Sequence, residues 1–268
     1  MKIDIHEAAL VCLEEKIVDK KIQLSNSVLD SCKNGFNLSE KPQEGDMKVG
    51  VPERPEMVPP NELPKRGFAT EKERMCLVHA IAHIEFNAIN LAWDAIYRFR
   101  NMPKEYYKNW LSVAKDETRH FTLLRSHLNK ASYDYGDFVA HNGLWKMAEQ
   151  TSEDVLHRMA IVPRVLEARG LDVTPTIIKK FRDAKEPEIA KTLELIYCEE
   201  IDHVRIGNRW FRYLCAQRNL SPLETFIELL KHYNLEGFRG CLNRPARKKA
   251  GFSEEELDLL QRSNCSQI

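Results

Sequence analysis

The sequence lacks the features that identify several common classes of protein. It contains no glycine-rich nucleotide-binding loop of the G-x-G-x-x-G or Walker type. Its seven cysteines are scattered and none forms a C-x-x-C pair, so neither a zinc cage nor a disulfide framework is indicated. The chain has 40 basic and 40 acidic residues, and its net charge therefore favours neither nucleic acid nor an anionic membrane as a partner.

The sequence also shows no long apolar run and no pattern typical of a secretory leader. We find no stretch approaching the roughly 20 apolar residues that span a bilayer. The start, "MKIDIHEAALVCLEEK", mixes acids with apolar residues, unlike a secretory signal. Unpaired thiols suit a reducing compartment. We therefore expect a cytoplasmic protein with no membrane partner, and 268 residues are enough for one sizeable core.

Proline is concentrated in one region, residues 41–67, which excludes a helix or a central strand there. Before it, residues 5–32 have a helical pattern and predict an N-terminal helix. The connector has too few Gly and Ser residues for a free tether. We expect it to lie on the surface as a strap, held by its apolar residues Val51, Met57, Val58 and Leu63.

After the strap the chain shows helical periodicity and very little strand alternation. Thr70 followed by Glu73 is a capping-box signature, and Gly170 suits the end of a helix. The four long helices are expected at about 70–101, at about 104–129, within 137–170, and at about 187–217. A short helix at 172–185, another at 222–235 and a last acidic helix are also expected.

Four long amphipathic helices with short connections predict an all-α fold, a helical bundle. We expect three parts: residues 1–67 as N-terminal helix and strap packed on the bundle, residues 68–235 as the bundle, and residues 236–268 as a C-terminal extension.

Two of these helices carry a carboxylate and an imidazole three residues apart, in "DETRHF" and in "EEIDHV". Positions three and four apart share one face of a helix. Glu117 lies between Val113 and Phe121 in the apolar stripe, with His120 one turn away. Glu200 and His203 lie in the stripe of the later helix in the same way. A single E-x-x-H is common on helix surfaces, but two in apolar stripes predict inward-facing ligands.

The other two long helices each add a carboxylate to the interior. Glu85 follows Ile81 by four residues, and Glu167 continues the steps of Leu156, Ala160 and Pro163. Four buried, ionised carboxylates would be prohibitively unstable without neutralisation. Two divalent cations would supply it, and the oxygen-rich donor set with two imidazoles suits iron or manganese better than zinc. The predicted metal ligands are Glu85, Glu117, His120, Glu167, Glu200 and His203.

Ionic pairing with arginines is the main alternative to metal binding. The arginines close enough in sequence are Arg119, Arg164, Arg169 and Arg205. If metal is bound, its imidazole ligands would need acceptors for their other N–H groups. Asp116, Glu199 and Asp202 are candidates for that role, and each is equally well explained as a solvated surface charge.

Several long blocks resemble a known bacterial family. They are "HAIAHIEFNAINLAWDAIYRF", "DETRHFTLL", "EEIDHVRIGNRWF" and the strap "VPERPEMVPPNELPKRG". They are similar to the ferritin-like family called domain of unknown function 455, over about residues 50–215. The resemblance implies a ferritin-like four-helix bundle, and the order Glu, E-x-x-H, Glu, E-x-x-H matches di-iron and di-manganese bundles. More distantly, the order resembles tRNA hydroxylases that act on 2-methylthio-isopentenyladenosine.

The leading functional hypothesis is an O2-dependent di-iron oxidase or monooxygenase. Its partners would be O2, a small-molecule or modified-nucleoside substrate and, for a monooxygenase, an electron donor. The sequence leaves open whether the chain forms a homodimer. The alternatives are a ferroxidase or iron-storage protein, a di-manganese peroxide dismutase and a tRNA-modifying hydroxylase. Basic clusters at 179–185 and 244–249 leave RNA contact open.

Overall fold

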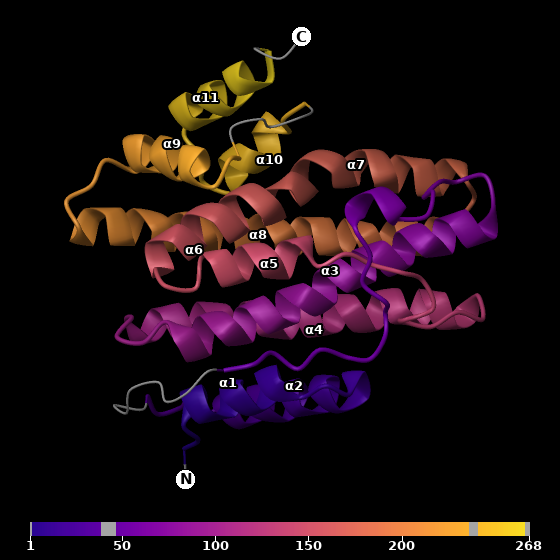
Figure 1. Cartoon of the computed structure of the whole chain (residues 1–268), viewed down its shortest axis with the longest axis horizontal. Coiled ribbons are helices and arrows are strands. Elements are labelled where there is room, and N and C mark those ends of the chain that lie inside the picture. The colour runs from indigo at the N-terminus through magenta and orange to yellow at the C-terminus, as the bar shows by residue number, and fades with distance from the viewer. Residues whose placement is uncertain (1, 39–46, 236–240, 266–268) are drawn as a thin grey trace. The chain divides into compact units, whose positions relative to one another are not determined.

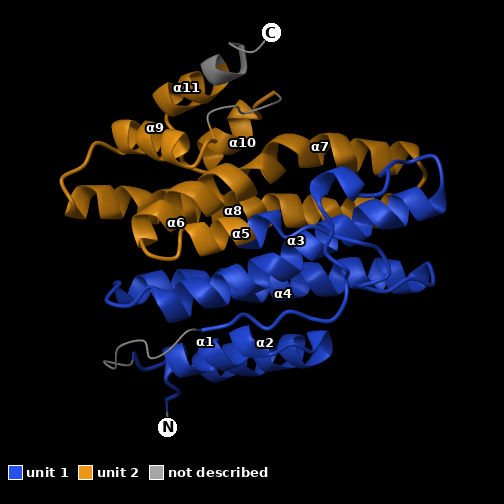
Figure 2. Cartoon of the chain, viewed as in Figure 1, with its two compact units in different colours: residues 1–145 blue, residues 146–268 orange. Residues whose placement is uncertain are grey.

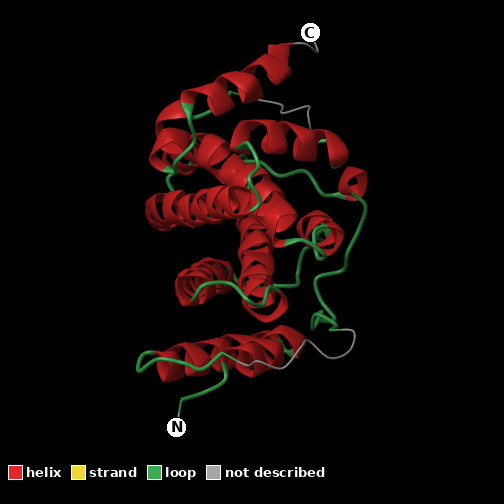
Figure 3. Cartoon of the chain, turned by 90° about the vertical axis from the view of Figure 1, so that its left-hand side faces the viewer, coloured by secondary structure: helices red, strands yellow, loops and turns green. Residues whose placement is uncertain are grey.

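The computed structural model of the chain describes residues 2–38, 47–235 and 241–265. Every regular element in these ranges is a helix, and the only β-type pairings there are two isolated bridges (Figure 3). The all-α prediction is therefore confirmed. The chain forms two compact units, residues 1–145 and 146–268 (Figures 1 and 2). The three-part division expected from the sequence stays a prediction.

Unit 1 consists of two long helices covered by two shorter ones. Helix α3 (Glu71–Arg98) packs along α4 (Lys104–Lys130), while α1 (Ile5–Glu14) packs on α3 and α2 (Val18–Cys32) packs on α4. The expected single N-terminal helix over 5–32 is thus two helices.

The start of α3 confirms the predicted capping box in a modified form. The Thr70 side chain accepts the Glu73 N–H at 3.2 Å, and the Glu73 carboxylate reaches back to the Ala69 N–H at 3.2 Å. These contacts satisfy donors that the first turn of a helix leaves open.

The proline-rich strap lies against unit 1, as expected for its described part; residues 41–46 lie outside the described residues. Of the apolar residues predicted to hold it, Val58 and Leu63 are half-buried, whereas Val51 and Met57 are exposed.

Backbone hydrogen bonds also hold the strap. The Val58 N–H donates to Ala140 O at 2.8 Å, and the Ala140 N–H donates to Glu56 O at 2.9 Å. The short 3-10 helix η1 (Pro60–Glu62) follows, so the prediction that residues 41–67 contain no helix is wrong at these three residues.

Unit 2 contains a long helical run packed along α8 (Pro187–Gln217). The run comprises α6 (Val155–Ile161), the π-helical segment η2 (Val162–Glu167) and α7 (Ala168–Asp183). This arrangement corrects the prediction of a helix ending at Gly170 and a separate helix at 172–185. Gly170 lies inside α7 and does not end a helix.

The remaining elements are short. The boundary between the units falls within α5 (Gly143–Gln150). Helices α9 (Pro222–His232), α10 (Arg244–Lys249) and α11 (Glu254–Cys265) complete unit 2. The expected C-terminal extension is tied into this unit by two buried arginine–carboxylate pairs, one between Arg247 and Asp172 and one between Arg164 and Glu256.

Within the described part of the chain, one helix, α3, is long and apolar enough to cross a membrane by length and composition, with a mean hydropathy of 1.3 over its best 18-residue window. This corrects the expectation that no such run exists. However, 78% of that window is buried inside the protein. Because core helices of soluble proteins have the same composition, α3 is weak evidence for a membrane span.

Candidate metal centre

The centre of unit 1 contains two carboxylates and an imidazole, Glu85 of α3 with Glu117 and His120 of α4, which we call the N-terminal triad. His120 Nδ1 lies 3.2 Å from Glu85 Oε2 and 3.4 Å from Glu117 Oε2. Glu85 is 5% exposed, Glu117 1% and His120 0%. Each residue offers a ligand atom within 4.8 Å of the others. Three atoms that close together can coordinate one ion.

Apolar packing between α3 and α4 positions the N-terminal triad. Phe86, next to Glu85, packs on Phe121, next to His120, with their ring centroids 5.3 Å apart. Tyr135, from the loop after α4, contacts both rings at 5.2 and 5.0 Å. The three aromatic rings fix the register of the two helices and therefore the separation of the two carboxylates. Tyr135 lies outside the helical patterns of the sequence, and no periodic signal revealed this contact.

Because the N-terminal triad is buried, the protonation of each of its residues depends strongly on the other two. Burial and the neighbouring Glu117 raise the pKa of Glu85 well above its ordinary value, although the His120 hydrogen bond opposes the shift. Burial also disfavours charge on His120, but hydrogen bonds to Glu117 and Glu85 outweigh it and raise the pKa of His120 to about 11. The triad is therefore a site where added positive charge is stabilised.

In unit 2 the predicted ligands are Glu167, Glu200 and His203, which we call the C-terminal triad. Glu200 and His203 are paired on α8, with His203 Nδ1 3.2 Å from Glu200 Oε1. His203 is buried and Glu200 is half-buried. Glu167 is also half-buried and is the last residue of η2. Together in one unit, α8 and η2 supply the donor types that the sequence predicts.

The π-helical segment has a local cause. Pro163 has no backbone N–H and cannot continue regular α-helical hydrogen bonding. The Ala168 N–H donates to Pro163 O, a five-residue step that widens the turn. On α8, Gly207 lies against the Pro163 ring, and a Cβ there would be 2.4 Å from the ring. Pro163 and Gly207 therefore set the direction in which Glu167 leaves the helix.

The structure brings Glu85, Glu117 and His120 together in one unit and pairs Glu200 with His203 in the other. A single centre formed by all six residues stays a prediction. Of the proposed outer acceptors, Asp202 is exposed and better explained as a surface charge, whereas Asp116 is half-buried. Asp116 accepts from Arg119 at 3.1 Å, and Asp202 pairs with Arg205 at 2.7 Å.

The arginines proposed as competitors for the buried carboxylates have other acidic partners. Arg119 and Arg205 pair with the two aspartates just named, and Arg164 is fully buried against Glu256. Arg169 is exposed. Three of the four arginines therefore have an acidic partner outside the two triads.

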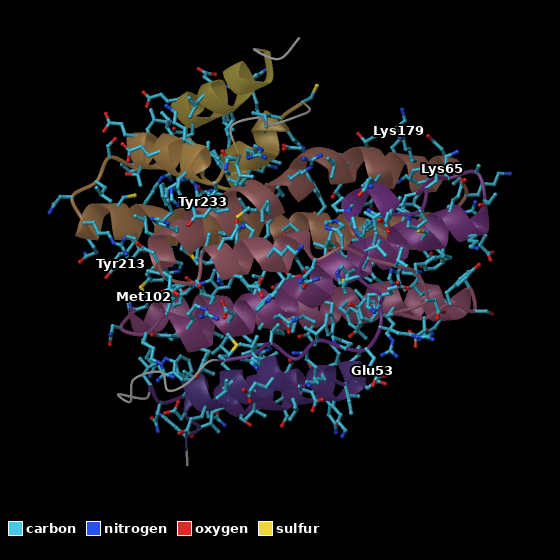
Figure 4. All side chains as sticks on the ribbon, in the orientation of Figure 1. Glu53, Lys65, Met102, Lys179, Tyr213 and Tyr233 are labelled. Atoms are coloured by element: carbon cyan, nitrogen blue, oxygen red, sulfur yellow. The ribbon has the colours of Figure 1, made fainter. Side chains whose placement is uncertain are left out.

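The two basic clusters differ in how they use their charge. In the 244–249 cluster, Arg244 donates to Glu254 and Asp258, and Lys248 pairs with Glu254. Most of that cluster is therefore neutralised within unit 2. On α7, Arg182 pairs with Glu194, while Lys179 extends from the helix into solvent (Figure 4).

Comparison with known proteins identifies relatives but no activity. A family model described as "Protein of unknown function (DUF455)" matches residues 14–258. An uncharacterized protein from Haemophilus influenzae (strain ATCC 51907 / DSM 11121 / KW20 / Rd) is 49% identical over 220 residues, which cover 80% of this chain and 76% of the relative. No solved structure matches the chain. From the extent of these matches, the chain belongs to the DUF455 family.

Proposed function

We propose that the chain is a ferritin-like, dinuclear metal protein that uses iron and O2 to oxidise an organic substrate. The observation that supports this most directly is the N-terminal triad. Two glutamates and a histidine, each at most 5% exposed, gather in the middle of a packed helix pair. The raised pKa values of His120 and Glu85 mean that protons balance the buried charge when no metal is bound, and a bound cation would replace those protons. A divalent cation is the partner that carboxylate and imidazole groups together bind well.

The second ion is inferred from the ligand set as a whole. The C-terminal triad repeats the same donor types, a lone glutamate and an E-x-x-H pair. Four carboxylates carry four negative charges and two divalent ions carry four positive ones. A glutamate from each of two helices and E-x-x-H from two others is the ligand arrangement of di-iron and di-manganese bundles. We therefore propose that both triads hold the two ions jointly.

When bound, two ferrous ions would supply electrons for the reduction of O2. In a monooxygenase reaction the substrate C–H bond becomes C–OH and the second oxygen atom leaves as water. The balance requires two further electrons and two protons, so a separate electron donor is part of this proposal. The protein would contribute fixed carboxylates and a water-poor setting, which its buried N-terminal triad provides.

Metal quantitation combined with O2 uptake tests the proposal. Protein loaded anaerobically with Fe(II) should bind two ions per chain, consume O2 and develop a ferric absorption band. Glu117→Gln should lose bound iron and O2 uptake together. Glu105→Gln, on the same helix and paired near the surface with Lys108, is the matched control and should retain both. Wild-type protein that binds no metal would refute the proposal.

The same preparation separates the rival functions. A storage protein that assembles as a shell would elute from size-exclusion chromatography far above dimer size. A di-manganese peroxide dismutase would retain manganese and decompose peroxide without a reductant. A tRNA-modifying hydroxylase would bind RNA with an affinity that falls steeply as salt rises. A dimer-sized iron protein that consumes O2 and shows none of these properties fits the leading proposal.

A further inference from the structure

Arg164 is a fully buried arginine in the same π-helical segment as the predicted ligand Glu167. Its Nε donates to Asn208 Oδ1 at 2.7 Å, and its Nη2 donates to Glu256. The guanidinium carbon lies 3.9 Å from the ring centroid of Phe226 and 4.1 Å from that of Phe211. The side chain is therefore held by α8, α9 and α11 at once.

A second buried arginine holds the other side of Glu167. Arg247 of α10 donates to Asp172 through Nε at 3.0 Å and through Nη2 at 2.7 Å. Its Nη2 also donates to the carbonyl oxygen of Ala168 at 3.2 Å. Ala168 directly follows Glu167 in the chain. The C-terminal helices thus contact the Arg164 side chain before the predicted ligand and the Ala168 backbone after it.

These contacts are more specific than packing of a terminal extension requires. Glu256 also accepts from Arg212 at 3.2 Å and from the Ser253 N–H at 2.8 Å. These two donors hold its carboxylate in place independently of Arg164. Burial lowers the pKa of Arg164 to about 10, which still leaves it charged at neutral pH. Loss of either partner would leave an uncompensated buried charge.

The π-helical segment η2, which receives these contacts, is less regularly hydrogen-bonded than the α-helices around it. A π turn has wider, less regular hydrogen bonding than an α-helix, and Pro163 removes one donor from it. Without external contacts, such a segment would relax toward other helical arrangements. Each relaxation would turn Glu167 in a different direction.

We propose that Arg164, locked in place by Glu256 of α11, is a positioning residue for Glu167, and that α10 and α11 belong to the support of the metal centre. The inference rests on the proposed function, because it assigns Glu167 a metal to bind. Arg164 acts through the backbone of η2 and does not itself contact the ion.

The test compares two variants that disturb this support with one that destabilises unit 2 elsewhere. Glu256→Gln keeps the size and a hydrogen-bond acceptor but removes the charge, and Arg164→Lys keeps the charge but removes the planar fork. The control is Phe181→Leu, because Phe181 is fully buried in α7 and distant in sequence from Glu167. All experiments use the full chain.

Two readouts are needed, Mn(II) affinity from the electron paramagnetic resonance of the free ion and amide hydrogen exchange of the metal-free protein. We expect at least tenfold weaker Mn(II) binding in both support variants, and at least tenfold faster exchange in residues 162–171. Phe181→Leu should bind Mn(II) with an affinity within twofold of the wild type, even if its melting temperature falls as far as those of the two support variants. If Glu256→Gln does not fold, Arg164→Lys provides the same comparison.

The outcomes distinguish the inference from the function on which it rests. Wild-type protein that takes up no Mn(II) and no Fe(II) overturns both. Wild-type binding with unchanged affinity in the support variants overturns only the positioning role. The same conclusion follows if exchange in residues 162–171 rises no more in Glu256→Gln than in Phe181→Leu. Weaker Mn(II) binding and faster local exchange confined to the support variants would establish it.

Discussion

Two histidines on one face of α3, His79 and His83, are buried in unit 1 close to the N-terminal triad in sequence but are bound to other groups. The Gly136 N–H donates to His79 Nε2 at 2.9 Å, so the proton of the neutral ring resides on Nδ1. His83 Nδ1 lies 2.9 Å from the Tyr135 hydroxyl, and its Nε2 lies 3.1 Å from the Asn87 amide. Both rings therefore hold the loop after α4.

Burial of these rings predicts acid sensitivity of unit 1. Burial is the main cause that lowers the pKa of both histidines to about 4; Arg66 adds to it, and Asp134 and Asp137 oppose it at His79. Between pH 6.5 and 4 the unfolded chain binds more protons than the folded one, so stability falls as the pH falls. From pH 7 to pH 5 each ring accounts for a loss of about 2 kcal/mol.

The variant His79→Gln should reduce this acid sensitivity while keeping an acceptor for the Gly136 N–H. We expect the difference in unfolding free energy between pH 7 and pH 5 to shrink by about 2 kcal/mol relative to the wild type. Urea unfolding at the two pH values, followed by circular dichroism, measures it. An unchanged difference would show that His79 does not carry the acid sensitivity.

Residue-scale predictions from the sequence succeeded where the helix stripe was unambiguous. Glu117 lies between Val113 and Phe121 in the sequence, and all three are buried as the pattern indicates. The stripe of α3 was less informative because its second half is buried nearly all round. Ile84, a large apolar residue next to the buried Glu85, is 51% exposed. A pattern of one face cannot be read from a helix that is apolar on most faces.

At the scale of elements, the break between α1 and α2 was not predictable from periodicity. The buried ammonium of Lys21 donates to the carbonyl oxygens of Cys12 and Leu13 at 2.8 and 2.9 Å, and to Asn90 Oδ1 at 2.8 Å. It satisfies the last carbonyls of α1, which a helix end leaves open. A lysine in an amphipathic pattern normally marks the solvent face, so the sequence suggested an uninterrupted helix.

Replacing Lys21 should therefore destabilise unit 1 much more than replacing its neighbour. Lys21→Met leaves the two carbonyl groups buried without their donor, and we expect a loss of about 2–3 kcal/mol. Lys20→Met, at an exposed position, should change stability by less than about 0.5 kcal/mol. Chemical denaturation of the two variants side by side measures the difference. Equal losses would contradict the capping role of Lys21.

Replacement by alanine should have opposite effects on stability at two glycines of unit 2, Gly207 and Gly170. At Gly207, an added Cβ would be 2.4 Å from the Pro163 ring, so Gly207→Ala must push α8 away from η2. We expect a loss of about 1–3 kcal/mol, together with weaker metal binding, since Glu167 lies on η2. Thermal denaturation and the Mn(II) titration provide the two measurements. A stable variant with normal Mn(II) affinity would contradict the role given to this contact.

Gly170 is the matched case inside a helix. Nothing lies within 4 Å of a Cβ placed there, and it is an interior position of α7. Gly170→Ala should therefore stabilise unit 2 by about 0.5–1 kcal/mol, because alanine loses less backbone freedom in a helix. A rise in melting temperature is the expected result. Destabilisation would instead favour the prediction from the sequence that a helix ends at Gly170.

At the scale of the whole molecule, each compact unit carries one E-x-x-H pair and one further predicted glutamate ligand. Helix positions and inward-facing ligands followed from local periodicity, because both depend on residues a few positions apart. The two-unit division and the buried ties of α10 and α11 could not follow from it. They depend on contacts such as Arg164 with Glu256, 92 residues apart.

Joint use of two ions by both triads makes a prediction about the whole chain that neither unit makes alone. Glu117→Gln changes the N-terminal triad and Glu200→Gln changes the C-terminal triad. If the triads share both ions, each single variant should weaken binding of both ions, and the double variant should lose little more. Independent sites would instead lose one ion in each single variant, with additive effects in the double variant. Mn(II) titration of the four proteins measures stoichiometry and affinity together. Additive, one-ion losses would show two separate mononuclear sites and would remove the basis for joint O2 chemistry at a dinuclear centre.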